Sequence, residues 1–277
     1  MQLVHNVAEL RERLASETSI CFVPTMGNLH AGHIHLVELA RQRGRCVVVS
    51  IFVNPLQFGA SEDLGSYPRT LEEDCKKLQS AGADVVFAPS EKDMYPVPQT
   101  ILVEPPSIAS ELCGVSRPGH FRGVATVVLK LFNMVQPQVA VFGKKDFQQL
   151  FIIRALVQQL NLPIEIVAGE TVREADGLAM SSRNGYLSTK DRAKAPQLHQ
   201  ALQQVKQVIQ AGHREYSTIE AQVNQDLAQL GWLPDYISVR SADSLMPATG
   251  TDHNLVVLGA ARLGNTRLID NIEFQIS

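Results

Sequence analysis

The run at residues 46–53 (CVVVSIFV) restricts the fold of this chain more than any other feature. It is almost continuously apolar and rich in β-branched residues, which is typical of a parallel strand covered on both faces. The pair Asn54-Pro55 then ends it, because proline cannot continue the hydrogen-bonded ladder. A strand of this kind requires helices on both sides of its sheet.

The first two-thirds of the chain supplies those helices by alternating strand and helix signals. Residues 70–81 predict a helix, with Thr70 and Glu73 as a capping box and Gly82 as its end. The alternation predicts a doubly wound, Rossmann-like parallel sheet. Strands are expected at 19–23, 46–53, 84–89, 100–103, 139–143 and 164–167, and helices at 34–43, 70–81, 124–135 and 146–160.

The pattern changes near Thr171, where an irregular polar stretch replaces the alternation. Two helices, at 190–211 and 217–230, and three strands, at 236–240, 255–261 and 266–269, are expected after it. Helices followed by a meander indicate a small α+β domain. We therefore expect two domains, residues 1–171 and 172–277.

Composition excludes several classes of protein. The 277 residues carry a formal net charge of −3 without a basic block, which argues against a nucleic-acid or membrane-surface partner. The apolar runs are too short for a transmembrane helix, and residues 1–13 carry charges where a signal peptide has its apolar core. Four scattered cysteines suggest a reducing compartment. We expect a cytoplasmic globular protein.

The stretch 24–33 (PTMGNLHAGH) joins the first long strand to a helix. A helix N-terminus offers unpaired N–H groups and a positive dipole end, which suit an anion. His30 and His33 are three residues apart and share one face of a helical turn. Backbone N–H groups beside two imidazoles fit a phosphate that gains charge during a reaction. The same histidines, with His35, could instead ligate zinc.

Polar clusters follow two further strands, at the edge where ligands of doubly wound sheets bind. Asn54, Gln57 and Phe58 follow the Val-rich run and either hold a small polar substrate or only turn the chain. Residues 142–149 (FGKKDFQQ) form a second strand-to-helix junction, where a lysine beside a helix N-terminus suits an anion. Asp146 there either caps the helix or bonds a ribose hydroxyl.

Two loops complete the candidate set. Residues 117–123 (RPGHFRG) are either a solvated loop or a contact for phosphate or carboxylate. Residues 181–185 (SSRNG) offer hydroxyls and a guanidinium that suit an oligophosphate, or form a simple Asn-Gly turn. A nucleoside triphosphate is the simplest common ligand of all these clusters. The chain contains neither G-x-x-x-x-G-K-[ST] nor G-x-G-x-x-G after a strand, so attack at the α-phosphate is favoured over γ-phosphate hydrolysis or hydride transfer.

With these motifs in place, the chain resembles the pantoate–β-alanine ligase family (pantothenate synthetases) from end to end. Residues 24–33 are similar to that family's form of the HxGH signature, which nucleotidylyltransferases and class I aminoacyl-tRNA synthetases share. The segments 54–58, 117–124, 142–149 and 180–184 together are specific to the ligase, and 260–271 is of family type. The residue before Lys145 is usually Glu or Gln in this family and is Lys144 here.

The resemblance implies a reaction in two steps. Pantoate attacks the α-phosphate of ATP to give pantoyl adenylate and pyrophosphate, and β-alanine then displaces AMP to give pantothenate. It implies Mg²⁺ with ATP as co-substrate, no organic prosthetic group, small-molecule partners only, and a homodimer. His33, His30 and Lys145 are the implied catalytic residues, with His33 often described as the proton donor. Charge stabilisation by both histidines suits adenylation better than proton transfer, because pyrophosphate leaves as an anion.

The resemblance also implies three sets of binding residues. The implied ATP contacts are Met26, Gly27, Asn28, Leu29, His30, Ala31, Gly32, His33, Gly143, Lys144, Lys145, Asp146, Val172, Met180, Ser181, Ser182 and Arg183. The implied contacts for pantoate and β-alanine are Pro24, Met26, Asn54, Gln57, Phe58, Arg117, His120 and Gln149. Asp74, with Glu73, matches a metal-linked position. The first domain is then expected to bind nucleotide and pantoate, and the smaller one to cover the ATP site.

Three other functions stay open at this point. A nucleotidylyltransferase acting on a phosphorylated metabolite would need basic residues for that phosphate, whereas Gln57, Phe58 and Gln149 suit an uncharged hydroxylated chain. A nucleotide-binding regulator would not need lysine, histidine, serine and arginine along one phosphate path. A zinc protein would use the three histidines at 30, 33 and 35.

Overall fold

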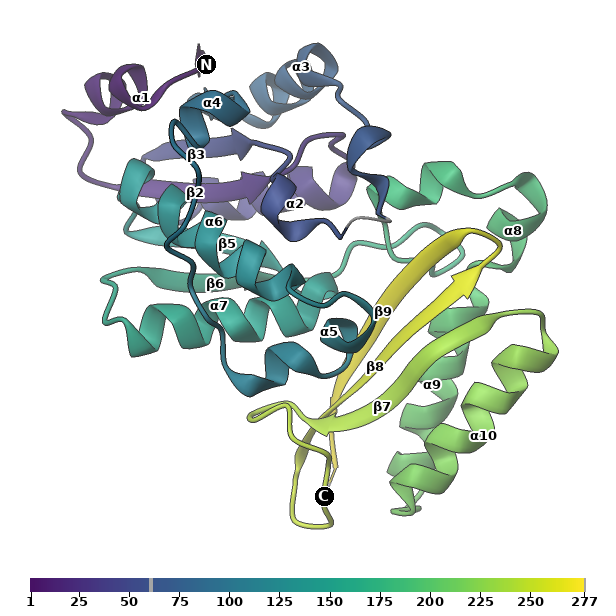
Figure 1. The fold of residues 1–277 in the computed structure, drawn as a ribbon. Coiled ribbons are helices and arrows are strands. Elements are labelled where there is room, and N and C mark those ends of the chain that lie inside the picture. Colours follow the sequence, from purple (N-terminus) through teal and green to yellow (C-terminus); the bar gives the residue numbers. More distant parts are fainter. Residues whose placement is uncertain (60–61, 277) are drawn as a thin grey trace. The chain divides into compact units, whose positions relative to one another are not determined.

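The computed structural model describes residues 1–59 and 62–276, and the chain divides into two compact units (Figure 1). The first unit comprises Met1–Lys144 and Gln149–Glu170, and the second comprises Lys145–Gln148 and Thr171–Ser277. The short piece at 145–148 belongs to the second unit although it lies within the first along the chain, which a boundary drawn by composition does not anticipate.

The first unit is built on one sheet in which every neighbouring pair of strands is parallel. This confirms the predicted doubly wound fold. Strand β2 lies between β3 and β5, so the chain proceeds from β2 to one side of the sheet and later returns to the other. The carboxyl end of β2 is therefore the switch point, where such sheets bind ligands. The strand order is β1 (Gln2–Val4), β4 (Val85–Phe87), β3 (Cys46–Ile51), β2 (Ile20–Thr25), β5 (Val139–Gly143), β6 (Glu165–Gly169).

Two apolar cores, one on each face, hold this sheet. Along β2, Cys21 and Val23 join the core that contains residues of α2, whereas Ile20 and Phe22 join the core that contains residues of α1, α6 and α7. The side chains alternate because successive residues of a strand point to opposite faces. The helices of this unit are α1 (Val7–Leu14), α2 (Ala31–Arg41), α3 (Leu71–Ala81), α4 (Glu91–Met94), α5 (Cys113–Ser116), α6 (His120–Val135) and α7 (Phe147–Gln159).

Two local predictions in the first unit are wrong. Thr70 makes no side-chain capping bond at the start of α3, because its hydroxyl donates to the Asp74 carboxylate instead. Residues 100–103 form no strand, and Val103 donates its N–H to the Thr126 hydroxyl rather than to a ladder partner. Helices α2 and α6 also begin a few residues before their predicted starts.

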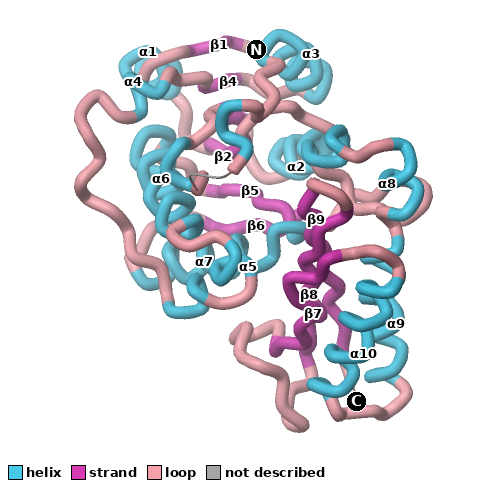
Figure 2. Tube along the Cα trace, turned by 45° about the vertical axis from the view of Figure 1, so that its right-hand side comes forward, coloured by secondary structure: helices cyan, strands magenta, loops and turns pink. Residues whose placement is uncertain are grey.

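The second unit is a three-stranded antiparallel meander with helices against it (Figure 2). Residues of α9 and α10 share one core with the sheet, among them Leu202, Val223 and Val257. The predicted helix at 190–211 is interrupted at Pro196, whose ring cannot donate a helical hydrogen bond. The elements are α8 (Thr189–Lys194), α9 (Gln197–Gln210), α10 (Tyr216–Gln229), β7 (Leu233–Ser241), β8 (Asn254–Leu263) and β9 (Thr266–Gln275). Across residues 1–59 and 62–276, every helix falls short of the length and apolar character of a membrane span.

Candidate active site

The turn after β2 places two imidazoles at the start of α2. His30 is the N-cap residue of the helix, and its Nδ1 accepts from the N–H of Gly32 at 3.2 Å. His33, at the third helical position, uses its Nδ1 to accept from the N–H of His30 at 3.3 Å. The pair thus forms a capping box, in which imidazoles replace the usual hydroxyl and carboxylate.

This capping box fixes the tautomer of both rings. A nitrogen that accepts a hydrogen bond carries no proton, so each neutral imidazole has its proton on Nε2. The ring centroids are only 4.1 Å apart, and a second proton on either ring would displace a backbone N–H and place a charge beside its neighbour. The capping box thus uses Nδ1 of each ring and does not involve Nε2 of either ring.

The backbone of the same turn is directed at a carboxylate. Gly27 and Asn28 have positive φ angles of 84° and 51°. The N–H groups of Asn28 and Leu29 each donate to Asp74, at 2.8 Å in both cases. Asp74 is fully buried on α3. The amide N–H groups of Asn28 and Leu29 are thus directed at the protein's own carboxylate, and contact of these two residues with ATP stays a prediction.

The exit of β3 brings together three residues expected to hold the acid substrate. Asn54 donates from Nδ2 to Oε1 of Gln57 at 3.1 Å, which fixes the orientation of the Gln57 amide. The Gln57 Nε2 then lies 3.0 Å from the sulfur of Met26, a weak acceptor. Asn54 is itself held by Tyr95, whose hydroxyl donates to Oδ1 at 2.7 Å. Asn54 thus positions Gln57, and the Gln57 amide keeps donor capacity for a stronger acceptor such as a substrate hydroxyl.

Arg117 and His120 support the same region from the start of α6. Arg117 forms a bidentate ion pair with Glu62, with N–O distances of 2.8 and 2.6 Å. Nδ1 of His120 lies 2.8 Å from the Gln57 carbonyl oxygen, and this ring is also buried. Phe58 packs edge-on against Tyr67 with ring centroids 5.9 Å apart. Arg117 and His120 are placed to hold the loop that carries Gln57, and substrate contact by either stays a prediction.

The residues that follow β5 belong partly to the first unit and partly to the second. Lys144 in the first unit forms an ion pair with Glu170 at 2.7 Å, so the extra charge at this position has a partner at the end of β6. Gln149 lies in the first turn of α7. This helix follows β5, which is the neighbour of β2 in the sheet. Lys145 and Asp146 belong to the second unit, with Lys145 Nζ 4.0 Å from the Asp146 carboxylate.

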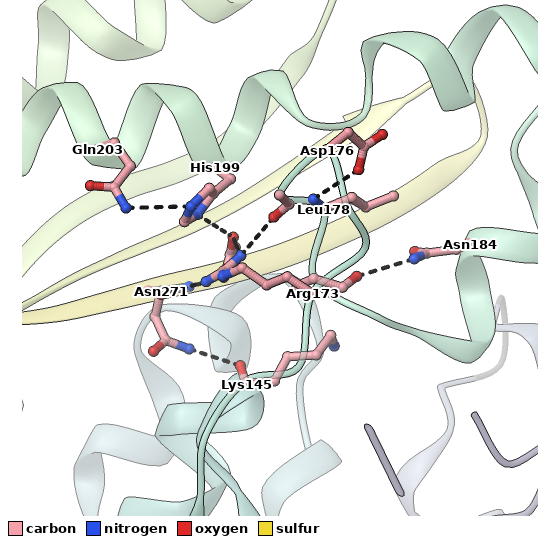
Figure 3. Close-up of polar contacts among 11 residues, drawn as sticks. Lys145, Arg173, Asp176, Leu178, Asn184, His199, Gln203 and Asn271 are labelled. Atoms are coloured by element: carbon pink, nitrogen blue, oxygen red, sulfur yellow. Dashed lines mark hydrogen bonds and ion pairs between the residues drawn. The ribbon is translucent and has the colours of Figure 1, made fainter. Parts of the chain in front are cut away.

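A network around Asp270 organises the second unit (Figure 3). Arg173 donates to both Asp270 oxygens, at 2.6 and 2.9 Å, and His199 Nδ1 lies 3.1 Å from the same carboxylate. Asn271, the next residue, donates from Nδ2 to the carbonyl of Lys145 at 2.9 Å. Burial alone raises the pKa of Asp270, but the hydrogen bonds and charges of His199 and Arg173 outweigh it and hold the pKa below its usual value.

The same network holds the expected ATP loop. Arg173 pairs with Ala179 as an isolated bridge, and the N–H of Met180 donates to the Val172 carbonyl at 3.0 Å. Val172 and Met180, eight positions apart in sequence number, are thus neighbours. Ser181 follows and accepts from the N–H of Arg183 at 3.2 Å, which starts a short helix (Ser182–Tyr186).

Sequence reasoning assigned no role to Arg173, His199, Asp270 or Asn271. The sequence did contain a signal for Asp270. This residue is two positions from Leu268 on β9, so the two side chains share the buried face of the strand. A carboxylate in a core-facing register needs a charged or hydrogen-bonding partner. The zinc alternative finds no support in the described part of the chain, where no three His, Cys, Asp or Glu side chains are grouped to hold a metal.

A parallel sheet with an imidazole-capped helix at its switch point is the arrangement of a nucleotide-binding α/β protein. The sequence matches the family described as Pantoate-beta-alanine ligase over residues 2–273, and the chain belongs to that family. It is 66% identical to the pantothenate synthetase of Methylobacillus flagellatus over 276 residues, which cover 100% of this chain and 99% of the relative. These matches confirm the family expected from the motifs.

Solved structures agree in fold. The pantoate-β-alanine ligase of Thermus thermophilus is 45% identical with a TM-score of 0.94, covering 98% of this chain and 99% of that one. The ligase of Francisella tularensis, solved in complex with β-γ ATP and β-alanine, is 34% identical with a TM-score of 0.84, covering 98% and 97%. The chain is thus a ligase of this family rather than a regulator or a transferase of phosphorylated metabolites.

Proposed function

We propose that this enzyme condenses pantoate with β-alanine through a pantoyl adenylate. The capping box of His30 and His33 is the observation that carries the proposal, since it fixes two imidazoles at the start of α2, at the switch point of the sheet. The Francisella relative, solved with β-γ ATP and β-alanine, supports ATP and β-alanine as two of the three substrates.

In the first step a pantoate carboxylate oxygen forms a bond to the α-phosphorus of ATP, and the bond from that phosphorus to pyrophosphate breaks. Negative charge grows on the phosphate oxygens, and hydrogen-bond donors that are already in place stabilise it. Neutral imidazoles suit this role, because donating an N–H hydrogen bond requires no proton transfer. In the second step the β-alanine amine attacks the acyl carbon and AMP leaves.

Gln57 and Gln149 are proposed to hold the hydroxyl groups of pantoate. Both follow strands that neighbour β2, at the carboxyl edge of the sheet. The Gln57 amide is oriented by Asn54 and faces only a sulfur acceptor, so a hydroxyl oxygen would be a better partner for its N–H. Phe58 and Pro24 would supply apolar contact.

The second unit is proposed to bind the phosphates and ribose of ATP. Lys145 would neutralise phosphate charge, and its backbone is fixed by Asn271. Ser181, Ser182 and Arg183 follow the hairpin that joins Val172 to Met180, and hydroxyls with a guanidinium suit an oligophosphate.

Magnesium is proposed to arrive bound to ATP, as Mg²⁺ is commonly held by substrate phosphates with few protein ligands. When bound it would neutralise charge on the departing pyrophosphate. Asp74 does not fit a direct bond to the ion, because both its oxygens already accept hydrogen bonds and the side chain is fully buried. Activity measured against free Mg²⁺ at fixed ATP tests the requirement.

Exchange of labelled pyrophosphate into ATP tests the two-step reaction. The purified enzyme is given ATP and pantoate without β-alanine, and label should enter ATP because the first step is reversible. A matched reaction without pantoate should show no exchange. Pantothenate formation without any exchange would overturn the adenylate intermediate.

A homodimer in the cytoplasm is part of the same proposal. Val124, Val127 and Val128 of α6 pack in the unit's own core. A second subunit could instead cover exposed apolar side chains that precede α6, which are Val97, Ile101, Leu102 and Val115. The four cysteines are free thiols, as in a reducing compartment. Light scattering of the purified protein measures the number of subunits.

A further inference from the structure

Asp74 closes a polar clamp around the turn that carries the histidines. Its Oδ1 accepts from the N–H of Leu29 at 2.8 Å. Its Oδ2 accepts from the N–H of Asn28 at 2.8 Å and from the Thr70 hydroxyl at 3.1 Å. Both oxygens of this fully buried carboxylate therefore accept hydrogen bonds from other groups of the protein.

Lys77 extends the clamp one turn further along α3. Its ammonium donates to the carbonyl of Leu29 at 2.7 Å, so one helix holds both the N–H and the C=O of the residue that precedes His30. Residues three and four apart share a helix face, which is why positions 70, 74 and 77 reach the same turn. The start of α2 is thereby tied to α3.

The conformation of the turn matches this clamp. Gly27 and Asn28 are successive residues with positive φ, and the N–H groups of Asn28 and Leu29 converge on the Asp74 carboxylate. A Cβ on Gly27 would lie 3.2 Å from the Asp74 carboxylate and 3.1 Å from Ile51, so glycine leaves the carboxylate room to approach. Here the converging N–H groups hold an internal carboxylate.

We propose that Asp74, assisted by Lys77, is a positioning residue that presents His30 and His33 to the α-phosphate, an inference that rests on the proposed adenylation. It acts through the backbone of Asn28 and Leu29 and touches no reacting atom. A direct bond to Mg²⁺ would require the ion to enter a fully buried site and to compete there with three hydrogen bonds. Asp74 therefore serves the reaction by geometry and holds no metal.

Asp74→Asn tests the clamp, with Glu72→Gln as the matched control on an exposed carboxylate of α3 that has no assigned role. Asparagine turns an NH₂ group toward one of the two backbone donors. We expect kcat for pyrophosphate exchange to fall about 10- to 100-fold, as for a small misplacement of catalytic groups. We expect an unchanged midpoint for Mg²⁺ activation, and faster amide hydrogen exchange at Asn28 and Leu29. Glu72→Gln should match the wild type in all three.

A shift of the Mg²⁺ midpoint by tenfold or more with amide exchange unchanged would overturn the proposal in favour of a metal ligand. An unchanged kcat would overturn it as well. If Asp74→Asn does not fold, Lys77→Gln decides the matter: a lower kcat with an unchanged Mg²⁺ midpoint supports the clamp, and a wild-type kcat refutes it. Amide hydrogen exchange is measured without turnover and tests the clamp alone. Pyrophosphate exchange by the wild type tests the adenylation itself. A failure of the clamp proposal can therefore be distinguished from a failure of the proposed reaction.

Discussion

Replacing His33 distinguishes a hydrogen-bond donor from a proton donor. Glutamine at this position can use Oε1 to accept from the His30 N–H, since glutamine is a usual residue at the third position of a capping box. Its Nε2 still offers N–H donors to a phosphate, but an amide cannot give up a proton. Alanine at the same position removes both the cap and the donor.

The structure sets the expected sizes of the two effects. One preorganised donor on a developing oxyanion is worth about 10²–10³ in rate, so His33→Ala should slow pyrophosphate exchange by that factor. The lost cap costs about 1 kcal/mol of stability, which leaves the protein folded. His33→Gln keeps the cap and the donor, and we expect it to be at least about tenfold faster than His33→Ala, recovering part of that factor.

The assay is pyrophosphate exchange at saturating ATP and pantoate, with thermal unfolding measured in parallel. His35→Gln is the control, since His35 lies two residues further along α2 and makes no part of the capping box. Equal rates for His33→Gln and His33→Ala would refute the reasoning, because they would show that a transferable proton is what His33 supplies.

Three further substitutions have defined outcomes. Asp270→Asn should lower the free energy of unfolding at pH 7 by about 1–3 kcal/mol, because it removes the charge partner of the partly buried Arg173. The pKa of Asp270 is lowered in the folded state. The stability that its charge contributes is therefore present above about pH 3.9 and is lost as the pH falls through the folded pKa. The difference in free energy of unfolding between wild type and variant, measured in urea, should therefore shrink in acid. Gly123→Ala would drive a Cβ into the Leu56 carbonyl and displace the Gln57 loop, so KM for pantoate should rise several-fold while KM for ATP stays constant. Lys144→Gln removes only a partly exposed ion pair, and KM for ATP measured under the same conditions should change by less than about twofold.

The sheet of the first unit was predictable because its strands are buried on both faces. Runs such as 46–53 are almost continuously apolar. An apolar run of this length between two turns is typical of a parallel strand that is covered on both faces. The signature turn was predictable for a similar reason, since its glycines and histidines stand between a clear strand and a clear helix. The edge of the sheet that carries the polar clusters then followed from the rule that places ligands beyond the carboxyl ends of parallel strands.

The contacts that cross between distant segments were not predictable. Thr70 reads as a helix cap, but a carboxylate one turn away competes for its hydroxyl. Asp74 lies 46 positions from Asn28 and its contact depends on how two helices pack. The partners of Asp270 come from separate segments, and periodicity reports which face a residue occupies without naming what it meets there.

The short piece at 145–148 gives the enzyme an unusual connectivity. The chain passes from one unit to the other at three points, after residues 144, 148 and 170, so no single peptide bond separates the two. A fragment ending at residue 170 would retain Lys145 but lose Asn271, which fixes its carbonyl. A fragment starting at residue 171 would keep Asn271 and lose Lys145. The smaller unit is therefore not a detachable module, and recombination or proteolysis at its apparent boundary would divide the residues proposed to bind the nucleotide.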